Sequence, residues 1–417
     1  MDSPMRLIHT ADWHLGQSLH GFDRRHEQQC FLNWLLETLV EKQVDALMIA
    51  GDIFDTANPS AQAQQQLYQF LTAARASLPH LNTILIAGNH DSPARLEAPR
   101  PFLQLLDAVV SGQVWRLPDG QHDLASLVVP LKDQTGAVAA WCLAVPFLRP
   151  TDVPKVVGEE DAFLAGVKQV YAQTLALAQA QASDQQAIIA LGHCYLQGGA
   201  ASQDSERRIV VGNSEALPAN LFSSALTYVA LGHLHLAQTV GQTDWIRYAG
   251  SPLPMSFAEA HYPHQVLCVE LAGQQLKAVE SLLIPRFVDL LRVPAKPAPL
   301  DKVLEALQAL VLETLPEAEQ PYLEVRVQLT APEPGLRQRI EEALHDKPVR
   351  LAKIETSYLR TEADDKPLAP LSLDELAELD PLQLLAELYQ QKYTAELPPE
   401  LSQAFLQLLQ ETQLEAV

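Results

Sequence analysis

The stretch Ala46-Leu47-Met48-Ile49-Ala50-Gly51-Asp52-Ile53-Phe54-Asp55 decides the fold, because five apolar residues run directly into a Gly-Asp-x-x-Asp turn. A short apolar run that is closed by a turn signal is typical of a buried strand. Side chains that follow such a strand lie at its carboxyl end, where ligand sites of α/β sheets are usually found. The stretch therefore predicts an α/β protein in which Asp52 and Asp55 face a cleft.

The same pattern recurs on both sides of this stretch. Polar residues follow four further apolar runs, namely Arg6–Thr10 before Asp12-Trp13-His14, Thr83–Ala87 before Gly88-Asn89-His90-Asp91, Ala187–Leu191 before Gly192-His193, and Tyr228–Leu231 before Gly232-His233-Leu234-His235. Helical patterns at Arg24–Lys42 and Ala61–Ala76 alternate with these runs. Strand-like runs without long helices follow at Ser126–Leu131, Ala139–Pro146, Trp245–Ala249 and Gln265–Leu271. We expect two sheets packed face to face with helices outside, in a four-layer α-β-β-α sandwich.

The residue types after the strands suit divalent transition metals. Carboxylate, amide and imidazole groups form a mixed oxygen and nitrogen set, and the absence of thiolates disfavours a structural zinc site. The pairs Asp12/His14 and His233/His235 have i, i+2 spacing, which in extended backbone places both side chains on one face, so that each pair can reach one site. Asp52 is the natural candidate for a carboxylate that bridges two metals.

Each motif taken singly has an ordinary interpretation. A lone histidine after a strand is usually a surface residue, and Gly-Asp-x-x-Asp is a common turn. All five motifs together, each at a strand end, favour a metal site. The histidines outside the motifs (His20, His80, His122, His261 and His264) are expected at the surface. His9, three residues before the first motif, is either another surface residue or a residue that supports the ligands.

The rest of the chain predicts a second domain and a tail. After Ile284-Pro285-Arg286 we expect a strand (Phe287–Val293), a Pro-rich link and a helix (Leu300–Thr314). A strand (Tyr322–Leu329), a helix (Gly335–Leu344) and a strand (Val349–Glu355) complete a small α+β domain. Two amphipathic helical patterns follow at Leu373–Tyr393 and Pro399–Leu414. The tail either packs on its own domain or docks onto a partner.

Composition limits the function. The net charge of −22 argues against a free-standing nucleic-acid binder, because DNA affinity rests on Lys and Arg. Cys30, Cys142, Cys194 and Cys268 are far apart in the chain and are expected to be free thiols. The chain has no long apolar run and no signal-peptide pattern at Met1, so we expect a cytoplasmic protein without a membrane span.

The motifs resemble those of the calcineurin-like metallophosphoesterase superfamily and, over essentially the whole chain, the SbcD family of bacterial nuclease subunits. The matching segments are Asp-Trp-His-Leu-Gly (12–16), Gly-Asp-Ile-Phe-Asp (51–55), Gly-Asn-His-Asp-Ser (88–92), Gly-His-Leu-His (232–235) and Tyr-Ala-Gly-Ser-Pro (248–252). The resemblance implies a first metal position held by Asp12, His14, Asp52 and His235. It implies a second metal position held by Asp52, Asn89, His193 and His233, with His90 as a catalytic histidine that binds no metal. We expect Asp55 to pair with His90 and orient its ring.

The resemblance also implies a function and partners. It implies a nuclease domain (1–285), a capping domain (286–362) and a helical segment (363–417) that docks on the coiled-coil base of an SbcC-type ATPase. The expected activity is metal-dependent DNA hydrolysis, most simply with two Mn²⁺ ions, as a double-strand exonuclease and a single-strand or hairpin endonuclease in DNA repair and recombination. A homodimer is implied too, through helices near Arg24–Lys42 or Arg95–Asp107.

The sequence fits three other functions less well. A small-molecule or cyclic-nucleotide phosphodiesterase needs neither the cap nor the tail. A protein Ser/Thr phosphatase has an Arg after Gly-Asp-x-x-Asp, where this chain has Thr56. A non-catalytic scaffold is expected to have lost ligands, and here the motifs are intact.

Overall fold

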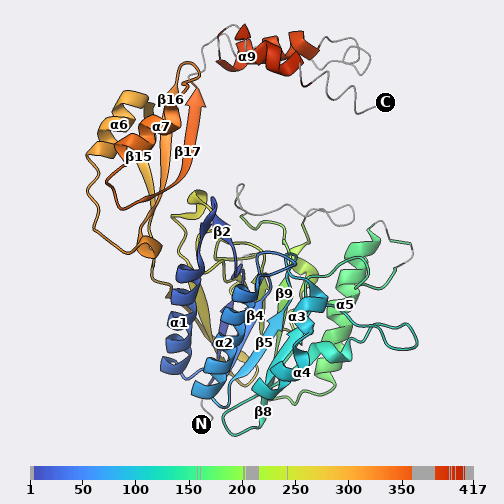
Figure 1. Cartoon of the computed structure of the whole chain (residues 1–417). Coiled ribbons are helices and arrows are strands. Elements are labelled where there is room, and N and C mark those ends of the chain that lie inside the picture. Colours follow the sequence, from blue (N-terminus) through green and yellow to red (C-terminus); the bar gives the residue numbers. More distant parts are fainter. Residues whose placement is uncertain are drawn as a thin grey trace. The chain divides into compact units, whose positions relative to one another are not determined.

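The computed structural model describes residues 4–156, 158–159, 161–200, 202, 216–241, 243–358, 381–393, 395, 397–399, 401–406 and 408 of the 417-residue chain. The chain divides into two compact units, Met1–Val288 and Asp289–Val417 (Figure 1). The larger unit carries the five motifs. Among the described residues, no helix combines the length and apolar character needed to cross a membrane.

The first sheet of the larger unit has the strand order β14-β13-β1-β4-β5-β6. Its strands are β1 (Met5–Thr10), β4 (Ala46–Ala50), β5 (Asn82–Ile86), β6 (Ala108–Ser111), β13 (Gln265–Ala272) and β14 (Gln275–Leu283). β1, β4, β5 and β6 are parallel, so their carboxyl ends share one edge of the sheet, whereas β13 runs antiparallel to β1 and β14. The sequence predicted neither β6, which has four residues, nor β14, whose side chains are largely exposed.

The second sheet has the strand order β11-β12-β10-β9-β8-β7. Its strands are β7 (Val128–Lys132), β8 (Val138–Ala144), β9 (Ala187–His193), β10 (Tyr228–Gly232), β11 (Gln238–Thr239) and β12 (Ile246–Tyr248). The four central strands are parallel and the two edge strands are antiparallel to their neighbours. The predicted strand at Ser126 begins two residues later, because Ala125–Leu127 forms a 3₁₀ turn.

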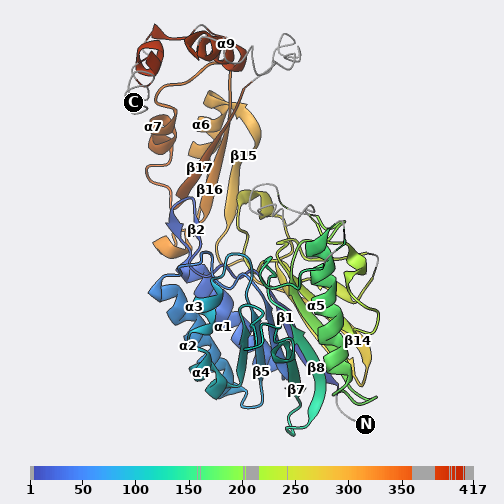
Figure 2. The same cartoon turned by 90° about the vertical axis from the view of Figure 1, so that its right-hand side faces the viewer.

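Helices cover the outer face of each sheet, as Figure 2 shows. The helices are α1 (Arg25–Glu41), α2 (Ala61–Ser77), α3 (Pro93–Glu97), α4 (Arg100–Leu103) and α5 (Ala162–Gln179). The side chains of Ser60 and Asp161 accept hydrogen bonds from backbone N–H groups in the first turns of α2 and α5, which fixes where these helices begin. A small hairpin of β2 (Ser18–Leu19) and β3 (Phe22–Asp23) precedes α1.

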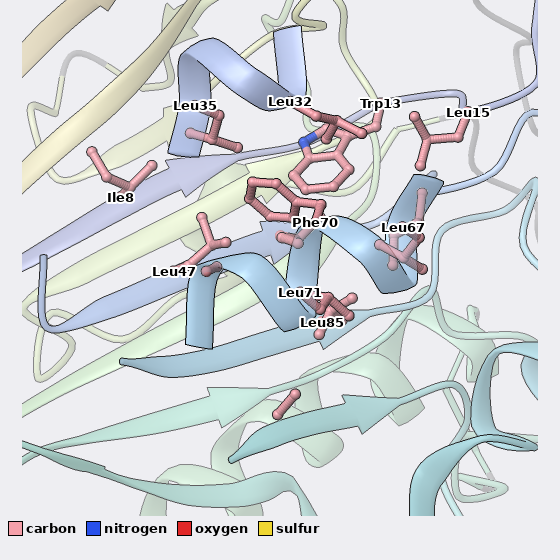
Figure 3. Close-up of a cluster of buried hydrophobic side chains, with 14 of the residues drawn as sticks. Ile8, Trp13, Leu15, Leu32, Leu35, Leu47, Leu67, Phe70, Leu71 and Leu85 are labelled. Atoms are coloured by element: carbon pink, nitrogen blue, oxygen red, sulfur yellow. The ribbon is translucent and has the colours of Figure 1, made fainter. Parts of the chain in front are cut away.

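Side-chain alternation along the strands produces the four layers. On the first sheet, Ile8, Leu47 and Leu85 face outward and pack with Leu35 of α1 and Phe70 of α2 (Figure 3). The residues next to them in these strands, Leu7, Met48 and Ile84, face the second sheet. They form a separate core between the sheets with Cys142, Ile189 and Ala230 of the second sheet, among others. A third core joins the second sheet to α5. These layers confirm the predicted α-β-β-α sandwich.

The smaller unit begins with a three-stranded parallel sheet, covered by two helices that share its core. Its elements are β15 (Leu290–Pro299), α6 (Leu300–Gln308), β16 (Tyr322–Leu329), α7 (Leu336–Ala343) and β17 (Arg350–Tyr358). The Pro-rich stretch predicted as a link is instead part of β15. Pairing with β16 passes from Val293 directly to Ala298, so the intervening residues bulge out of the ladder, where prolines are tolerated on an edge strand.

The helical tail is described in part. Helix α9 spans Pro381–Tyr393 and covers the second half of the helix predicted from Leu373. The ring of Tyr393 meets that of Tyr358, at the end of β17, edge to face at 5.0 Å. The predicted helix start at Leu373 and half of Pro399–Leu414 lie outside the described residues.

Candidate metal centre

The loops that follow β1 and β4 are joined by backbone hydrogen bonds. Asp12 N–H donates to Gly51 O (3.0 Å), His14 N–H to Asp52 O (3.0 Å) and Leu15 N–H to Ile53 O (2.9 Å). Three of these residues have left-handed backbone angles, with φ of 54° at Asp12, 45° at His14 and 48° at Asp52. Such conformations are unfavourable for non-glycine residues and concentrate at functional sites. The backbone therefore aims these side chains at a fixed point.

The first cluster contains Asp12, His14 and His235, whose ligand atoms all lie within 4.8 Å of one another. All three side chains are buried. Nδ1 of His14 faces the Asp55 carboxylate at 3.3 Å, but Nε2 makes no hydrogen bond, although His14 is only 4% exposed. A buried imidazole in that state is costly unless another partner is bound. This cluster thus fits a divalent metal ion.

The second cluster contains Asp52, His193 and His233, again within 4.8 Å of one another. The amide oxygen of Asn89 lies 3.0 Å from His193 Nε2 and 3.0 Å from His233 Nδ1, so Asn89 belongs to the same group. Asp52 Oδ2 is 3.4 Å from His193 Nε2 and 3.8 Å from His14 Nε2. Asp52 therefore stands between the two clusters, as a bridging carboxylate must.

Burial and mutual proximity shift the pKa values of these groups. Burial alone would raise the pKa of Asp52, but His193 and His14 beside it hold the value well below its usual range. Burial raises the pKa of Asp12 to about 7, although His193 and His235 oppose the rise. Burial lowers the pKa of His233 to about 3, and His193 adds to the effect. His233 is therefore neutral at pH 7, which is the form that binds a metal.

His90 lies beside both clusters and is oriented by Asp55. Its Nδ1 is 2.7 Å from the backbone carbonyl oxygen of Asp55, and its backbone N–H donates to Asp52 Oδ1 (2.8 Å). Because a carbonyl only accepts, Nδ1 carries the proton, and Nε2 of the neutral ring is the nitrogen without a proton. The expectation that the Asp55 carboxylate orients this ring needs correction, since Asp55 Oδ1 instead lies 3.3 Å from His14 Nδ1.

Two carboxylates that the sequence did not assign support the site. Asp91 is buried and accepts hydrogen bonds from the backbone N–H groups of Ile53 (3.1 Å), Phe54 (3.0 Å) and Gly88 (2.9 Å), which ties two motif loops together. Glu259 is fully buried, and its Oε1 lies 2.9 Å from His235 Nδ1. The only sequence signal for Asp91 was its place beside His90, and Glu259 had none.

The structure also places the cysteines and the histidines outside the motifs. All four cysteines are free; Cys142 and Cys268 are buried, and the other two are half-buried. His264 was expected at the surface but is buried, with Nδ1 2.8 Å from Ser251 O. His9 is also buried and contacts Tyr228 and Leu231 on the second sheet rather than a residue of either cluster.

Two family models match the chain. The model described as calcineurin-like phosphoesterase matches residues 5–237, and the model described as type 5 capsule protein repressor C-terminal domain matches residues 286–393. The first match covers both sheets up to His235 and thus every residue of the two clusters. The fold and the site together define a calcineurin-like phosphoesterase.

Three curated relatives narrow the family. The SbcD subunit of the nuclease SbcCD from Rhodobacter capsulatus is 41% identical to this chain over 84% of the chain and 86% of its own length. The SbcD subunits from Escherichia coli K12 and Bacillus subtilis 168 are 37% and 36% identical over 67% of this chain, and over 68% and 70% of their own lengths. The chain belongs to this SbcD family of SbcCD nuclease subunits.

Proposed function

We propose that this chain is the metal-dependent nuclease subunit of an SbcCD-type complex and hydrolyses phosphodiester bonds in DNA. The observation that carries the proposal is the pair of buried ligand clusters on either side of Asp52, with His90 oriented beside them. When bound, two divalent ions would activate a water molecule and offset the negative charge on the phosphoryl oxygens. The first metal position uses Asp12, His14, Asp52 and His235, and the second uses Asp52, Asn89, His193 and His233.

The chain's own residues bind and orient. His90 presents Nε2 to the substrate while Nδ1 is held by the Asp55 carbonyl (2.7 Å), so the ring keeps one orientation through the reaction. With Nε2 protonated, the ring either donates a hydrogen bond to a phosphoryl oxygen or gives its proton to the leaving oxygen. Asp91 fixes the loop that carries Asn89 and His90 against the loop that carries Asp52.

We propose Mn²⁺ as the working ion. The donors are carboxylate, amide oxygen and imidazole, a set that suits manganese and iron as well as zinc. A thiolate ligand would favour zinc or an iron–sulfur cluster, and among the described residues neither cluster contains one.

The acidic chain is expected to hold DNA with a partner. With a net charge of −22 it lacks the excess of Lys and Arg that phosphate binding requires. We assign that role to an SbcC-type coiled-coil ATPase, docked on residues 363–417. In this proposal residues 1–285 form the nuclease domain and residues 286–362 the capping domain. Truncation after residue 362 should keep metal-dependent nuclease activity and abolish co-purification with the ATPase.

We further propose a homodimer within the complex. The side chains of Phe102 and Leu105, in α4 and the turn after it, are 73% and 79% exposed. Large apolar side chains exposed next to each other are typical of interaction surfaces. Replacing both with Ser should convert a dimer to a monomer in light scattering while Mn²⁺ binding is retained.

The direct test is digestion of blunt duplex and hairpin DNA with and without Mn²⁺, and with and without the ATPase. We expect cleavage only with the metal, and faster cleavage with the partner and ATP. An aryl phosphodiester serves as the comparison substrate. Hydrolysis of the aryl ester without any cleavage of DNA in the complete complex would reject the nuclease function in favour of a small-molecule phosphodiesterase.

A further inference from the structure

The histidines of the two metal positions differ in what lies behind them. In the first position, Nδ1 of His235 is 2.9 Å from the Glu259 carboxylate, and Nδ1 of His14 is 3.3 Å from the Asp55 carboxylate. In the second position, Nδ1 of His193 is 2.8 Å from the backbone carbonyl oxygen of Ala50. Carboxylates therefore back the imidazoles of the first position, and a neutral carbonyl backs His193.

The placement of Glu259 is specific. It ends the 3₁₀ turn Phe257–Glu259, and its side chain is fully buried. Oε2 accepts a hydrogen bond from the backbone N–H of Met255 (2.7 Å), which leaves Oε1 aimed at His235. Because both oxygens accept, the Nδ1 of His235 must carry its proton. The lone pair of the imidazole is thereby confined to Nε2.

Asp55 makes a weaker version of the same contact. Its side chain is 30% exposed, and the 3.3 Å contact with His14 Nδ1 is longer than that of Glu259 with His235. Solvent screens a charge at such a site more than it screens one in the interior. The effect of Asp55 on its imidazole is expected to be the smaller of the two.

We propose that Glu259 is a positioning residue which, assisted by Asp55, makes the first metal position the tighter of the two. A carboxylate behind a ligating imidazole fixes its tautomer and raises its basicity, and such partners contribute about 10- to 100-fold to metal affinity. The Ala50 carbonyl fixes the tautomer of His193 but adds no negative charge, and the Asp12 carboxylate, 4.0 Å from the same nitrogen, is itself assigned to the first metal position. The first ion therefore occupies the position of Asp12, His14 and His235, and the second exchanges more freely. The inference rests on the metal site of the proposed function.

Glu259→Gln is the sharpest variant, because it keeps size and removes charge. If the Gln amide NH₂ faces His235, Nδ1 must accept and the proton moves to Nε2, which blocks the metal. If it faces Met255 instead, two N–H groups oppose each other. The full-length protein would be titrated with Mn²⁺, with free ion followed by its electron paramagnetic resonance signal. We expect the tighter Kd to rise about 10- to 100-fold, the weaker Kd to change less, and Asp55→Asn to give a smaller rise.

The controls separate this inference from the proposed function. Glu41→Gln, at an exposed position on α1, should reproduce both wild-type Kd values. His193→Ala should remove the weaker binding event and His235→Ala the tighter one. Two wild-type events with an unchanged tighter Kd in Glu259→Gln, or loss of the tighter event in His193→Ala, would overturn the inference alone. Failure of the wild-type chain to bind two ions would instead overturn the metal site itself. If Glu259→Gln does not fold, Asp55→Asn decides: an unchanged tighter Kd there overturns the inference.

Discussion

The two sheets contribute different chemistry to one site. The first sheet contributes every proposed oxygen ligand, Asp12, Asp52 and Asn89, from loops that follow β1, β4 and β5. The second sheet delivers only imidazoles, His193, His233 and His235, at or after β9 and β10. His14 is the one imidazole from the first sheet. A mixed oxygen and nitrogen site therefore exists only where the carboxyl ends of both sheets meet, and the stability of the sandwich and the integrity of the site depend on the same contacts.

The largest effect is expected for Asp52→Asn, which removes the negative charge of a carboxylate that lies beside histidines from both sheets. Asp52 Oδ2 lies within 3.4 Å of His193 Nε2 and within 3.8 Å of His14 Nε2, so both metal positions depend on it. Hydrolysis of DNA should fall by at least about 1,000-fold, because ligands of a two-metal site act as a unit. Elemental analysis after desalting should find less than one ion per chain.

Asp184→Asn, an exposed residue outside the site, is the matched control and should retain full activity. If Asp52→Asn kept two ions per chain, the bridging assignment would be wrong.

A smaller loss is expected for His90→Asn, which leaves both ligand clusters intact. In the proposed assignment His90 is not a metal ligand, and its ring is held by the Asp55 carbonyl. Removing a positioned acid or hydrogen-bond donor typically costs about 100- to 10,000-fold in rate. The variant should lose that much in kcat with two ions still bound, whereas His345→Asn on the exposed surface of the smaller unit should lose nothing. Loss of an ion in His90→Asn would make His90 a ligand.

Local patterns predicted the strands and the motifs, but they did not predict which side chains meet. The i, i+2 spacing of His233 and His235 suggested a shared site, yet the structure places them in different clusters. Side chains at i and i+2 share a face only in extended backbone, and His233 has φ of 103°. The pairing of Glu259 with His235 was invisible because it spans 24 residues and lies in a 3₁₀ turn without periodicity. The resemblance supplied the grouping that spacing could not.

The contact between the sheets can be broken without replacing a proposed ligand, although a Cβ atom at Gly232 would also lie 2.9 Å from His193 Nδ1. A Cβ atom added at Gly232 would lie 1.9 Å from Ala50 O, so the backbones of β10 and β4 would have to move apart. Gly232→Ala should lower the free energy of unfolding by at least about 1–3 kcal/mol, the range for overpacking a core, and should weaken Mn²⁺ binding as well. Urea unfolding and Mn²⁺ titration measure the two effects.

Gly199→Ala is the comparison for Gly232, because its Cβ would meet chiefly the end of the flexible Leu234 side chain, at 2.5 Å. It should change stability by less than Gly232→Ala. Equal effects of the two substitutions would mean that the close approach of the sheets is not what limits the site.

The smallest effect concerns His9, a titratable contact between the sheets. Its Nε2 is 3.1 Å from Leu231 O and therefore carries the proton, while Nδ1 accepts from the Tyr228 hydroxyl at 2.9 Å. Burial lowers the pKa of His9 to about 3. In the unfolded chain a histidine has a pKa of about 6.5, so between pH 6.5 and pH 3 His9 is protonated when the chain is unfolded and neutral when it is folded. The contribution of neutral His9 to stability is therefore present above pH 6.5 and is lost as the pH falls from there toward 3.

The expected slope from His9 is about 1.4 kcal/mol of unfolding free energy per pH unit, once the pH is well below the unfolded value. Urea unfolding of the metal-free protein between pH 7 and pH 5 measures it. Other groups titrate in this range in both proteins, so the difference between wild type and His9→Asn isolates the contribution of His9. The variant should be less stable at pH 7 because it loses contacts between the sheets, but its stability should fall less steeply with acid. Parallel curves would show that His9 does not link the two sheets in its neutral form.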